Sequence, residues 1–180
     1  HQLKCKAKLK SNTLVATVMG NLGLYKFAEK YGILTSATKV GDRYVLQEML
    51  ERDFCVGGEQ SGHIIFREYI TTGDGQLSGL QLMGLLKESG QSLSQAASIM
   101  QVFPQTLLNI RSTPRMKQSL EDPEVVEAIQ RENRALDGNG RILVRPSGTE
   151  PLIRIMVEGQ DIGEIEATAK RIADVIAAKG

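Results

Sequence analysis

The sequence predicts an α/β fold in two parts: a mixed α/β layer domain over residues 1–102, then a smaller α+β domain over residues 103–180. In the first part, apolar strand-like runs alternate with amphipathic helical segments, which is typical of α/β layer domains. In the second part, the order strand, helix, strand, strand, helix favours a small antiparallel sheet with its helices on one face. Between them, "QVFPQ" at residues 101–105 contains a proline and is predicted to be a linker.

The first elements follow from local signals. The β-branched, apolar run "NTLVATVM" at residues 12–19 predicts a buried strand. Asn21 is placed to cap a helix that ends near Tyr31, before Gly32. "ILTSATK" predicts a second, weaker strand, and residues 43–53 have the apolar spacing of an amphipathic helix.

The rest of the first domain is bounded by glycines and caps. "FCVGGEQSG" predicts a short strand that runs into a glycine-rich loop, and "HIIFREYI" predicts the next strand. Asp74 or Thr72 can cap a long helix from about Gly75 to Ser89, with Gly90 as its stop. Ser92 can cap a short helix that ends near Met100.

The second domain is predicted in the same way. "TLLNIRS" predicts a strand, and Asp122 followed by Pro123 predicts the start of a helix through about Leu136. "RILVR" and "LIRIMVE" predict two strands, and in the second Ile153, Ile155 and Val157 share one face. A final helix is expected over residues 161–178, where isoleucines and alanines recur at helical spacing.

Composition excludes several classes of function. The net charge is +1, aromatic residues make up 4% of the chain and tryptophan is absent, so a nucleic-acid-binding surface is not expected. The lysines of "KCKAKLK" at residues 4–10 predict a solvated terminal tail. No apolar run approaches the ~20 residues of a membrane span. Cys5 and Cys55 have no metal-binding spacing, and reduced cytosolic thiols are expected.

The loop between the last two predicted strands contains the groups of a phosphate site. Arg145 offers a planar guanidinium, Ser147 and Thr149 offer hydroxyls, and Gly148 lets backbone amides approach an anion. Arg154 can add a second positive charge from the next strand, while Glu150 points away or orients an arginine. The alternative, a plain Pro-Ser-Gly turn with an incidental arginine, stays open at this point.

A second loop, "GGEQSGH" at residues 57–63, suits a sugar. Glu59, Gln60 and Ser61 bring a carboxylate, an amide and a hydroxyl, which can hydrogen-bond to vicinal hydroxyl groups. The alternative is a turn between strands with His63 as the first residue of the next strand.

Taken together, "GGEQSGH" and "RPSGTEPLIRIMVE" resemble the bacterial phosphoglucosamine mutases of the α-D-phosphohexomutase superfamily. "TVMGNLGLYK", "VGDRYV" and "TTGDGQLSGLQL" extend the resemblance over nearly the whole chain. Members of that family have four domains, and this chain is similar to the third and fourth. The resemblance implies cytoplasmic supply of amino sugar for cell-wall precursors.

The resemblance implies a role for each loop. Glu59 and Ser61 would bind ring hydroxyls, with Gln60, Gly62 and His63 beside them, and Gln60 resembles the glucosamine-specific members. Arg145, Ser147, Gly148 and Thr149 would hold the substrate phosphate that is not reacting. Gly41, Asp42 and Arg43 are further candidates near the sugar.

The family's reaction interconverts glucosamine 6-phosphate and glucosamine 1-phosphate through a phosphoserine and a 1,6-bisphosphate that turns around in the site. The phosphoserine loop and the Mg²⁺ loop belong to the first two domains, and neither motif occurs here. "TGDG" at 72–75 and "GDR" at 41–43 each contain a single aspartate, too few oxygen ligands for Mg²⁺. We therefore expect no catalytic residue and no metal site in this chain, which should be inactive without the missing N-terminal domains.

Three alternatives remain at this point: a phosphomannomutase or phosphoglucomutase of the same superfamily, a non-catalytic phosphosugar-binding module, and a structural partner protein. The expected partners are a phosphosugar and the missing domains, with no nucleic acid and no membrane. A hinge is expected near Phe103–Pro104, because the last domain must admit and release substrate.

Overall fold

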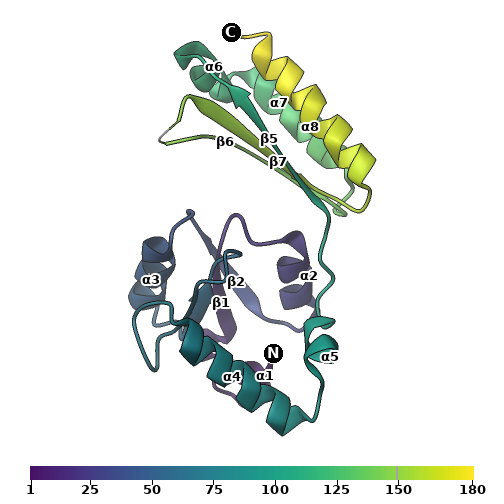
Figure 1. The fold of residues 1–180 in the computed structure, drawn as a ribbon. Helices are drawn as coiled ribbons and strands as arrows, with labels where there is room; N and C mark the ends of the chain where they lie inside the picture. Colours follow the sequence, from purple (N-terminus) through teal and green to yellow (C-terminus); the bar gives the residue numbers. More distant parts are fainter. Residues whose placement is uncertain (149) are drawn as a thin grey trace. The chain divides into compact units, whose positions relative to one another are not determined.

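A computed structural model of the chain describes residues 1–148 and 150–180. The described chain divides into two compact units, His1–Val102 and Phe103–Gly180, which are considered separately here. Figure 1 shows that each unit has its own sheet and its own helices. None of the helices in these residues is long and apolar enough to span a bilayer.

The N-terminal unit contains a four-stranded mixed sheet in the order β2-β1-β3-β4. Its strands are β1 (Thr13–Thr17), β2 (Leu34–Thr38), β3 (Val56–Gly58) and β4 (Ile64–Phe66). β1 pairs in parallel with β2 and with β3, and β4 pairs antiparallel with β3. The predicted mixed α/β layer is confirmed by this sheet. β4 is shorter than "HIIFREYI" suggested, because the amides of Tyr69 and Ile70 turn back onto the Phe66 carbonyl.

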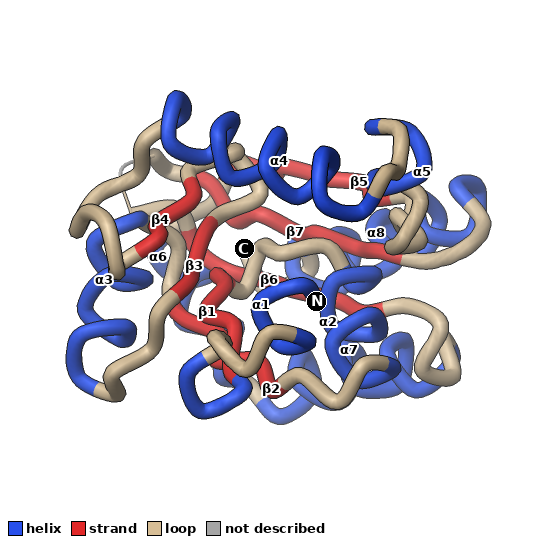
Figure 2. Tube along the Cα trace, turned by 90° about the horizontal axis from the view of Figure 1, so that it is seen from below, coloured by secondary structure: helices blue, strands red, loops and turns tan. Residues whose placement is uncertain are grey.

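The three helices of this unit for which a capping residue was predicted begin directly after that residue, whereas the first helix was not predicted. The helices of the unit are α1 (Gln2–Cys5), α2 (Leu22–Lys30), α3 (Asp42–Glu51), α4 (Gly75–Ser89) and α5 (Leu93–Ala97), with a 3-10 turn η1 (Lys10–Asn12). The Asn21 side chain accepts the amide of Gly23, and the Asp74 carboxylate accepts the amide of Leu77, each at 2.9 Å. Ser92 forms a capping box at the start of α5. In Figure 2, α4 lies beside β4, with which it is in contact.

The core of this unit forms between the sheet and α3. Val15, Val45, Met49, Phe54 and Ile65 are buried together. β3 reaches this core at Gly57, where a Cβ atom would lie 2.7 Å from Val45 Cγ1 and 2.8 Å from Met49 Sδ. The small residue therefore lets the strand that leads into the 57–63 loop pack directly on α3.

Lys6, Lys8 and Lys10 are exposed to solvent as predicted, but the segment that carries them is bound to the folded unit and is not a free tail. Lys4 Nζ donates to the carbonyl oxygen of Tyr31 at 2.6 Å, and Lys6 forms an ion pair with Glu88 of α4. Their partners come from distant parts of the chain, which a local charge pattern does not reveal.

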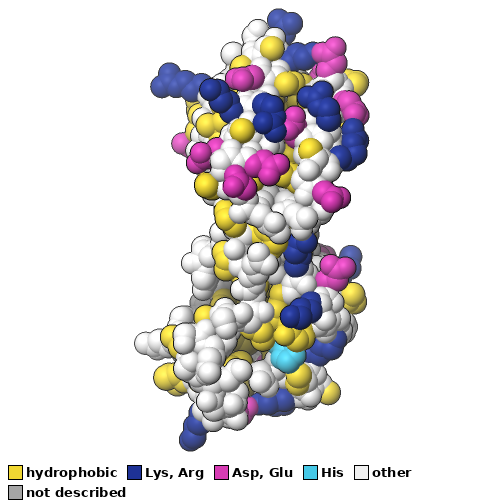
Figure 3. Space-filling model, turned by 90° about the vertical axis from the view of Figure 1, so that its right-hand side faces the viewer, with side chains coloured by type: hydrophobic (Ala, Val, Ile, Leu, Met, Phe, Trp, Pro, Cys, Tyr) yellow, Lys and Arg dark blue, Asp and Glu magenta, His cyan; other side chains and the backbone are white. Residues whose placement is uncertain are grey.

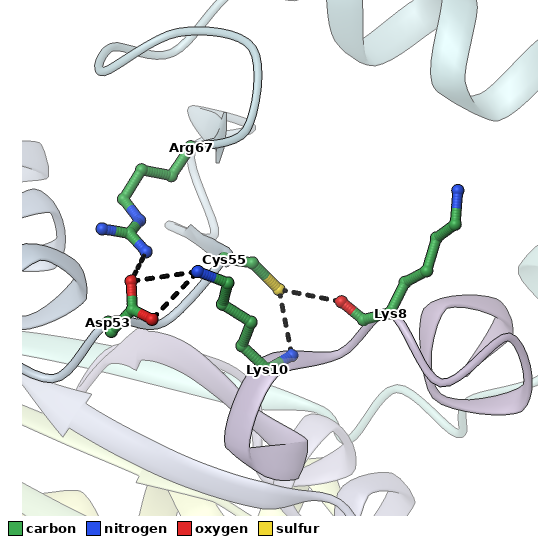
Figure 4. A network of polar contacts seen from close by, with 5 residues as sticks. All are labelled: Lys8, Lys10, Asp53, Cys55 and Arg67. Carbon is green, nitrogen blue, oxygen red and sulfur yellow. Dashed lines mark hydrogen bonds and ion pairs between the residues drawn. The ribbon is translucent and has the colours of Figure 1, made fainter.

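Further along the same segment, a polar network holds residues 8–10 (Figure 4). Lys10 Nζ lies 2.9 Å from Asp53 Oδ2, and Arg67 pairs with the same carboxylate. Because both cations hydrogen-bond to Asp53, the pKa of its carboxyl group lies below the usual value. The Cys55 thiol donates to the Lys8 carbonyl and accepts the Lys10 amide, each at 3.4 Å.

The C-terminal unit is an antiparallel three-stranded sheet in the order β5-β7-β6. Its elements are β5 (Gln105–Arg111), α6 (Pro114–Gln118), the 3-10 turn η2 (Ser119–Glu121), α7 (Pro123–Ala135), β6 (Arg141–Pro146), β7 (Leu152–Glu158) and α8 (Ile162–Ala177). In Figure 1, α7 and α8 lie together on one face of the sheet. The predicted α+β arrangement is confirmed, whereas α6 and η2 were not predicted.

One face of β7 supplies the centre of this unit's core. Ile153, Ile155 and Val157 are fully buried, and they pack with residues of α7 and α8 such as Val125 and Ile172. The outer surface of this unit carries intermixed cations and anions on the face seen in Figure 3.

We predict that Gly57→Ala destabilises the N-terminal unit, because the new methyl group has no space beside Val45 and Met49. The free energy of unfolding should fall by about 1–3 kcal/mol. The control is Gly84→Ala on α4, where a Cβ meets nothing within 4 Å and alanine favours the helix by up to ~1 kcal/mol. Urea denaturation of both variants checks this; equal stability of the two would contradict the packing of β3 on α3.

Candidate functional site

The 57–63 loop is a tight hairpin connection between β3 and β4. The Glu59 amide donates to the His63 carbonyl at 2.9 Å, and the Gly62 amide donates to the Glu59 carbonyl at 3.0 Å. Gly62 has a φ of +92°, which strongly favours glycine. The turn leaves Gln60 and Ser61 exposed at its tip, where a ligand could reach them.

The Glu59 carboxylate is fixed by a second segment. Its Oε1 accepts the backbone amide of Gly41 at 2.9 Å, at the start of α3. The structure thereby brings the candidate residue Gly41 next to the 57–63 loop. A carboxylate can accept several hydrogen bonds, and the Gly41 amide supplies one of them. The Glu59 carboxylate can therefore also accept a hydrogen bond from a sugar hydroxyl.

His63 is held between two further segments. Its Nε2 accepts the amide of Gly73 at 3.0 Å and lies 3.6 Å from Asp42 Oδ2. The His63 ring is therefore positioned by residues of two segments distant in sequence.

Arg43, the remaining candidate near the sugar loop, contacts its neighbour Tyr44. Its guanidinium lies 4.5 Å from the centre of the Tyr44 ring and donates a hydrogen bond to the Tyr44 hydroxyl. This hydrogen bond lowers the pKa of the Tyr44 phenol and raises the pKa of Arg43.

The second loop connects β6 to β7, and the described part of it is organised by its own hydrogen bonds. The Ser147 amide donates to the Leu152 carbonyl, and the Leu152 amide donates to the Glu150 carbonyl, each at 2.8 Å. The Ser147 hydroxyl is buried and accepts the Glu150 amide at 3.2 Å. Ser147 therefore shapes the loop, and its hydroxyl hydrogen remains a possible donor to an anion. The candidate Thr149 lies outside the described residues.

Two arginines stand opposite each other where this loop begins. Arg145 of β6 pairs directly with Arg154 of β7 in the strand register, so both side chains project from the same face of the sheet. Like charges in directly opposed positions destabilise a sheet. Glu150 offsets one of them, because its Oε2 lies 2.6 Å from Arg154 Nη2. Of the two expectations for Glu150, the structure therefore supports the orientation of an arginine.

Arg154 also has an unsatisfied donor. Its Nε is buried and has no hydrogen-bond partner among the described residues. A buried, unpaired donor on a charged group is costly, and an anionic ligand or an ordered water molecule would satisfy it. This feature could not be predicted from the sequence, because it depends on the strand register.

Lys117 is a further cation of this site that the sequence analysis missed. It lies on α6, and its Nζ donates to the carbonyls of Ser147 and Glu150 at 3.4 and 3.3 Å. Thr113 followed by Pro114 was the available signal: the Thr113 hydroxyl caps α6 by accepting the Met116 amide, with proline at the first helical position.

The residues that the structure describes offer no site for a divalent metal ion. Among the residues that the structure describes, no three His, Cys, Asp or Glu side chains lie close enough together to hold one. Asp74 uses its carboxylate to cap α4, and Asp42 stands alone beside His63. Mg²⁺ requires more oxygen ligands than a single aspartate supplies.

The chain combines a mixed α/β unit, whose β3–β4 loop is the candidate sugar site, with an α+β unit, whose β6–β7 loop is the candidate phosphate site. Two family descriptions match this chain: "Phosphoglucomutase/phosphomannomutase, alpha/beta/alpha domain III" over residues 1–103 and "Phosphoglucomutase/phosphomannomutase, C-terminal domain" over residues 107–175. The chain therefore belongs to the phosphoglucomutase/phosphomannomutase family.

Curated relatives within this family carry a more particular name. The phosphoglucosamine mutase of Caldicellulosiruptor saccharolyticus is 51% identical over 175 residues, which is 97% of this chain and 39% of the relative. The phosphoglucosamine mutase of Desulforamulus reducens is 52% identical over 174 residues, again 97% and 39%. The chain thus spans about two fifths of the length of the relatives that it matches.

Solved structures share the fold at lower sequence identity. The N-acetylphosphoglucosamine mutase of Aspergillus fumigatus superimposes with a TM-score of 0.75 at 20% identity, covering 93% of this chain and 38% of that one. An N-acetylglucosamine-phosphate mutase in its substrate complex gives a TM-score of 0.72 at 20% identity, covering 91% and 38%.

We predict that Gly73→Ala displaces the His63 ring, because a Cβ at position 73 would lie 2.2 Å from His63 Nε2. The control is Gly75→Ala, where a Cβ meets nothing within 4 Å. In proton–carbon NMR spectra, the ring signals of His63 should shift in the first variant and stay in place in the second, with His1 as an internal reference. Unchanged His63 signals in Gly73→Ala would show that Gly73 does not position the ring.

Proposed function

We propose that this chain is the sugar-binding and phosphate-binding part of a longer enzyme that interconverts glucosamine 6-phosphate and glucosamine 1-phosphate. Residues 1–102 would act as the third domain and residues 103–180 as the fourth. The identity of about 50% to phosphoglucosamine mutases supports the choice of glucosamine over mannose or glucose.

The observation that carries the proposal is the opposed pair Arg145 and Arg154 at the start of the second loop. A phosphate dianion between them would relieve their repulsion and accept hydrogen bonds from both guanidinium groups, including the buried Nε of Arg154. The backbone amide of Gly148 and the hydroxyl of Ser147 would supply further donors. Thr149 is assigned to the same role from its place in the sequence.

The sugar ring is assigned to the first loop. Glu59 would accept a ring hydroxyl with the carboxylate that Gly41 already orients, and Ser61 would donate to or accept from its neighbour. Gln60, at the exposed tip, is assigned to the discrimination of the amino sugar, with Gly62 and His63 as supporting residues. The sugar can bind in two opposed poses, because its hydroxyls exchange places when it turns and either phosphate can occupy the second loop.

The phosphoryl-transfer chemistry is assigned to the part of the enzyme outside this chain. A phosphoserine and a Mg²⁺ ion would both be held there, since the carboxylates described here do not form a metal site. Among the structural neighbours, one N-acetylphosphoglucosamine mutase was solved with magnesium and GlcNAc-6P. The partners of this chain are then a phosphosugar and the preceding domains of the same protein. We place the enzyme in the cytoplasm, which suits the free thiols of Cys5 and Cys55.

We predict that Arg145→Gln weakens binding of glucosamine 6-phosphate to the 180-residue chain by about 10- to 100-fold, the usual range for a lost charge-assisted hydrogen bond. Arg131→Gln, an exposed arginine on α7, is the control and should leave the affinity unchanged. The measurement is an NMR titration that follows the amides of Gly62 and Gly148. A shift at neither amide would favour a structural role for the chain instead.

We also predict that the 180-residue chain alone does not interconvert the glucosamine phosphates, because it lacks the phosphoryl donor. Joined to the front region of the Caldicellulosiruptor saccharolyticus enzyme, it should turn over glucosamine 6-phosphate faster than mannose or glucose phosphates. A coupled assay of the three substrates distinguishes the outcomes. Robust turnover by the chain alone would contradict the proposal. Faster turnover of mannose or glucose phosphate by the joined chain would show that glucosamine phosphate is not the preferred substrate.

A further inference from the structure

The longest helix of the N-terminal unit lacks a cover for its apolar side chains. α4 has no buried residue along its whole length, Gly75–Ser89. Leu80, Leu82 and Met83 are 63%, 41% and 59% exposed. A helix with apolar residues on several faces is normally covered on more than one side. α4 is in contact with β4, yet these three side chains stay exposed and are free to pack against a partner.

A groove of about 630 Å³ runs beside this helix. Its walls are α4, strand β4 and the first turn of the chain, and side chains such as Leu82, Leu85, Ile64, Phe66 and Leu3 line it. Ile64 is 37% exposed although it belongs to a strand of the central sheet. Exposed apolar area of this kind marks a surface for association.

The start of the chain forms one wall of the groove. His1, Leu3 and Lys6 line it, and Lys6 is tied to Glu88 of α4 by an ion pair. The network around Asp53 and Cys55 holds the following residues, 8–10, in place (Figure 4). A segment attached to His1 would therefore leave from the edge of the groove, and it would reach α4 over a short tether at high effective concentration.

We infer that this groove and the exposed side of α4 form the docking surface for the domain that precedes His1 in the longer protein. The inference rests on the proposed function in one respect: that function requires a domain before His1. The matched descriptions are domain III and the C-terminal domain, and the relatives carry about three fifths of their length outside the matched part. The partner surface should be apolar where it meets Leu82 and Ile64.

The test measures whether Leu82 becomes covered. Leu82→Cys is made in a Cys5→Ser, Cys55→Ser background, in the 180-residue chain and in the chain joined at His1 to the front region of the Caldicellulosiruptor saccharolyticus enzyme. We expect thiol labelling to be at least tenfold slower in the joined chain. The control is Leu34→Cys on β2, 63% exposed and outside the groove, which should label at the same rate in both.

A second variant tests the same surface through stability. Leu82→Asp should leave the unfolding midpoint of the 180-residue chain unchanged and lower that of the joined chain. Equal labelling of Leu82→Cys in both chains, or an unchanged midpoint in the joined Leu82→Asp chain, overturns the inference. Slow labelling in the 180-residue chain with dimers seen by sedimentation also overturns it, because a second copy is then the occupant. If Leu82→Cys is protected in the joined chain but that chain does not turn over glucosamine phosphate, the result counts against the proposed function and leaves the docking surface supported.

Discussion

Antiparallel strand pairing is the constraint on which both candidate loops depend. The 57–63 loop closes the β3–β4 pair and the second loop closes the β6–β7 pair, so each loop has its two ends fixed by a ladder of hydrogen bonds. The pairs are in turn fixed by packing: Gly57 lets β3 approach α3, and Ile153 and Ile155 bury one face of β7. Hydrophobic packing thus determines where the polar groups of each loop can lie.

Register also explains the charge distribution at the candidate phosphate loop, which connects β6 to β7. A slip of one residue would move Arg154 to the core face and remove it from Arg145. The buried isoleucines of β7 prevent that slip. The chain thereby holds the two cations Arg145 and Arg154 side by side. The carboxylate of Glu150 pairs with Arg154 and compensates one of the two positive charges. An arrangement that is unfavourable in the free protein would become favourable on binding of the dianion that we propose, and binding sites commonly trade stability for affinity in this way.

The sequence predicted what is local and missed what is not. The caps Asn21, Asp74 and Ser92 lie next to the amides that they bind, so residue types and spacing were sufficient. The strands of both sheets also followed from apolar patterns, apart from the early end of β4. The contacts of Lys4 and Lys6 were missed because their partners are more than twenty residues away.

The same division applies to the candidate site. The loops themselves were evident, because glycine, proline and small polar residues mark turns in any sequence. The contacts of Glu59 with Gly41, of His63 with Gly73 and of Lys117 with the second loop join segments distant in sequence. These contacts cannot be predicted from the spacing of residues in the sequence. They required the tertiary structure, and they are the contacts that orient the polar groups.

The central claim is that the hydrogen bonds of the 57–63 loop and of the described part of the second loop form before any ligand binds. Amide hydrogen exchange of the free 180-residue chain tests it most directly. The amides of Glu59 and Ser147 donate to His63 and Leu152 carbonyls, so they should exchange at least tenfold more slowly than those of the exposed Ser61 and Gly148, after correction for sequence. Equal, unprotected exchange at all four amides would show that the loops become ordered only on binding, and would contradict the claim.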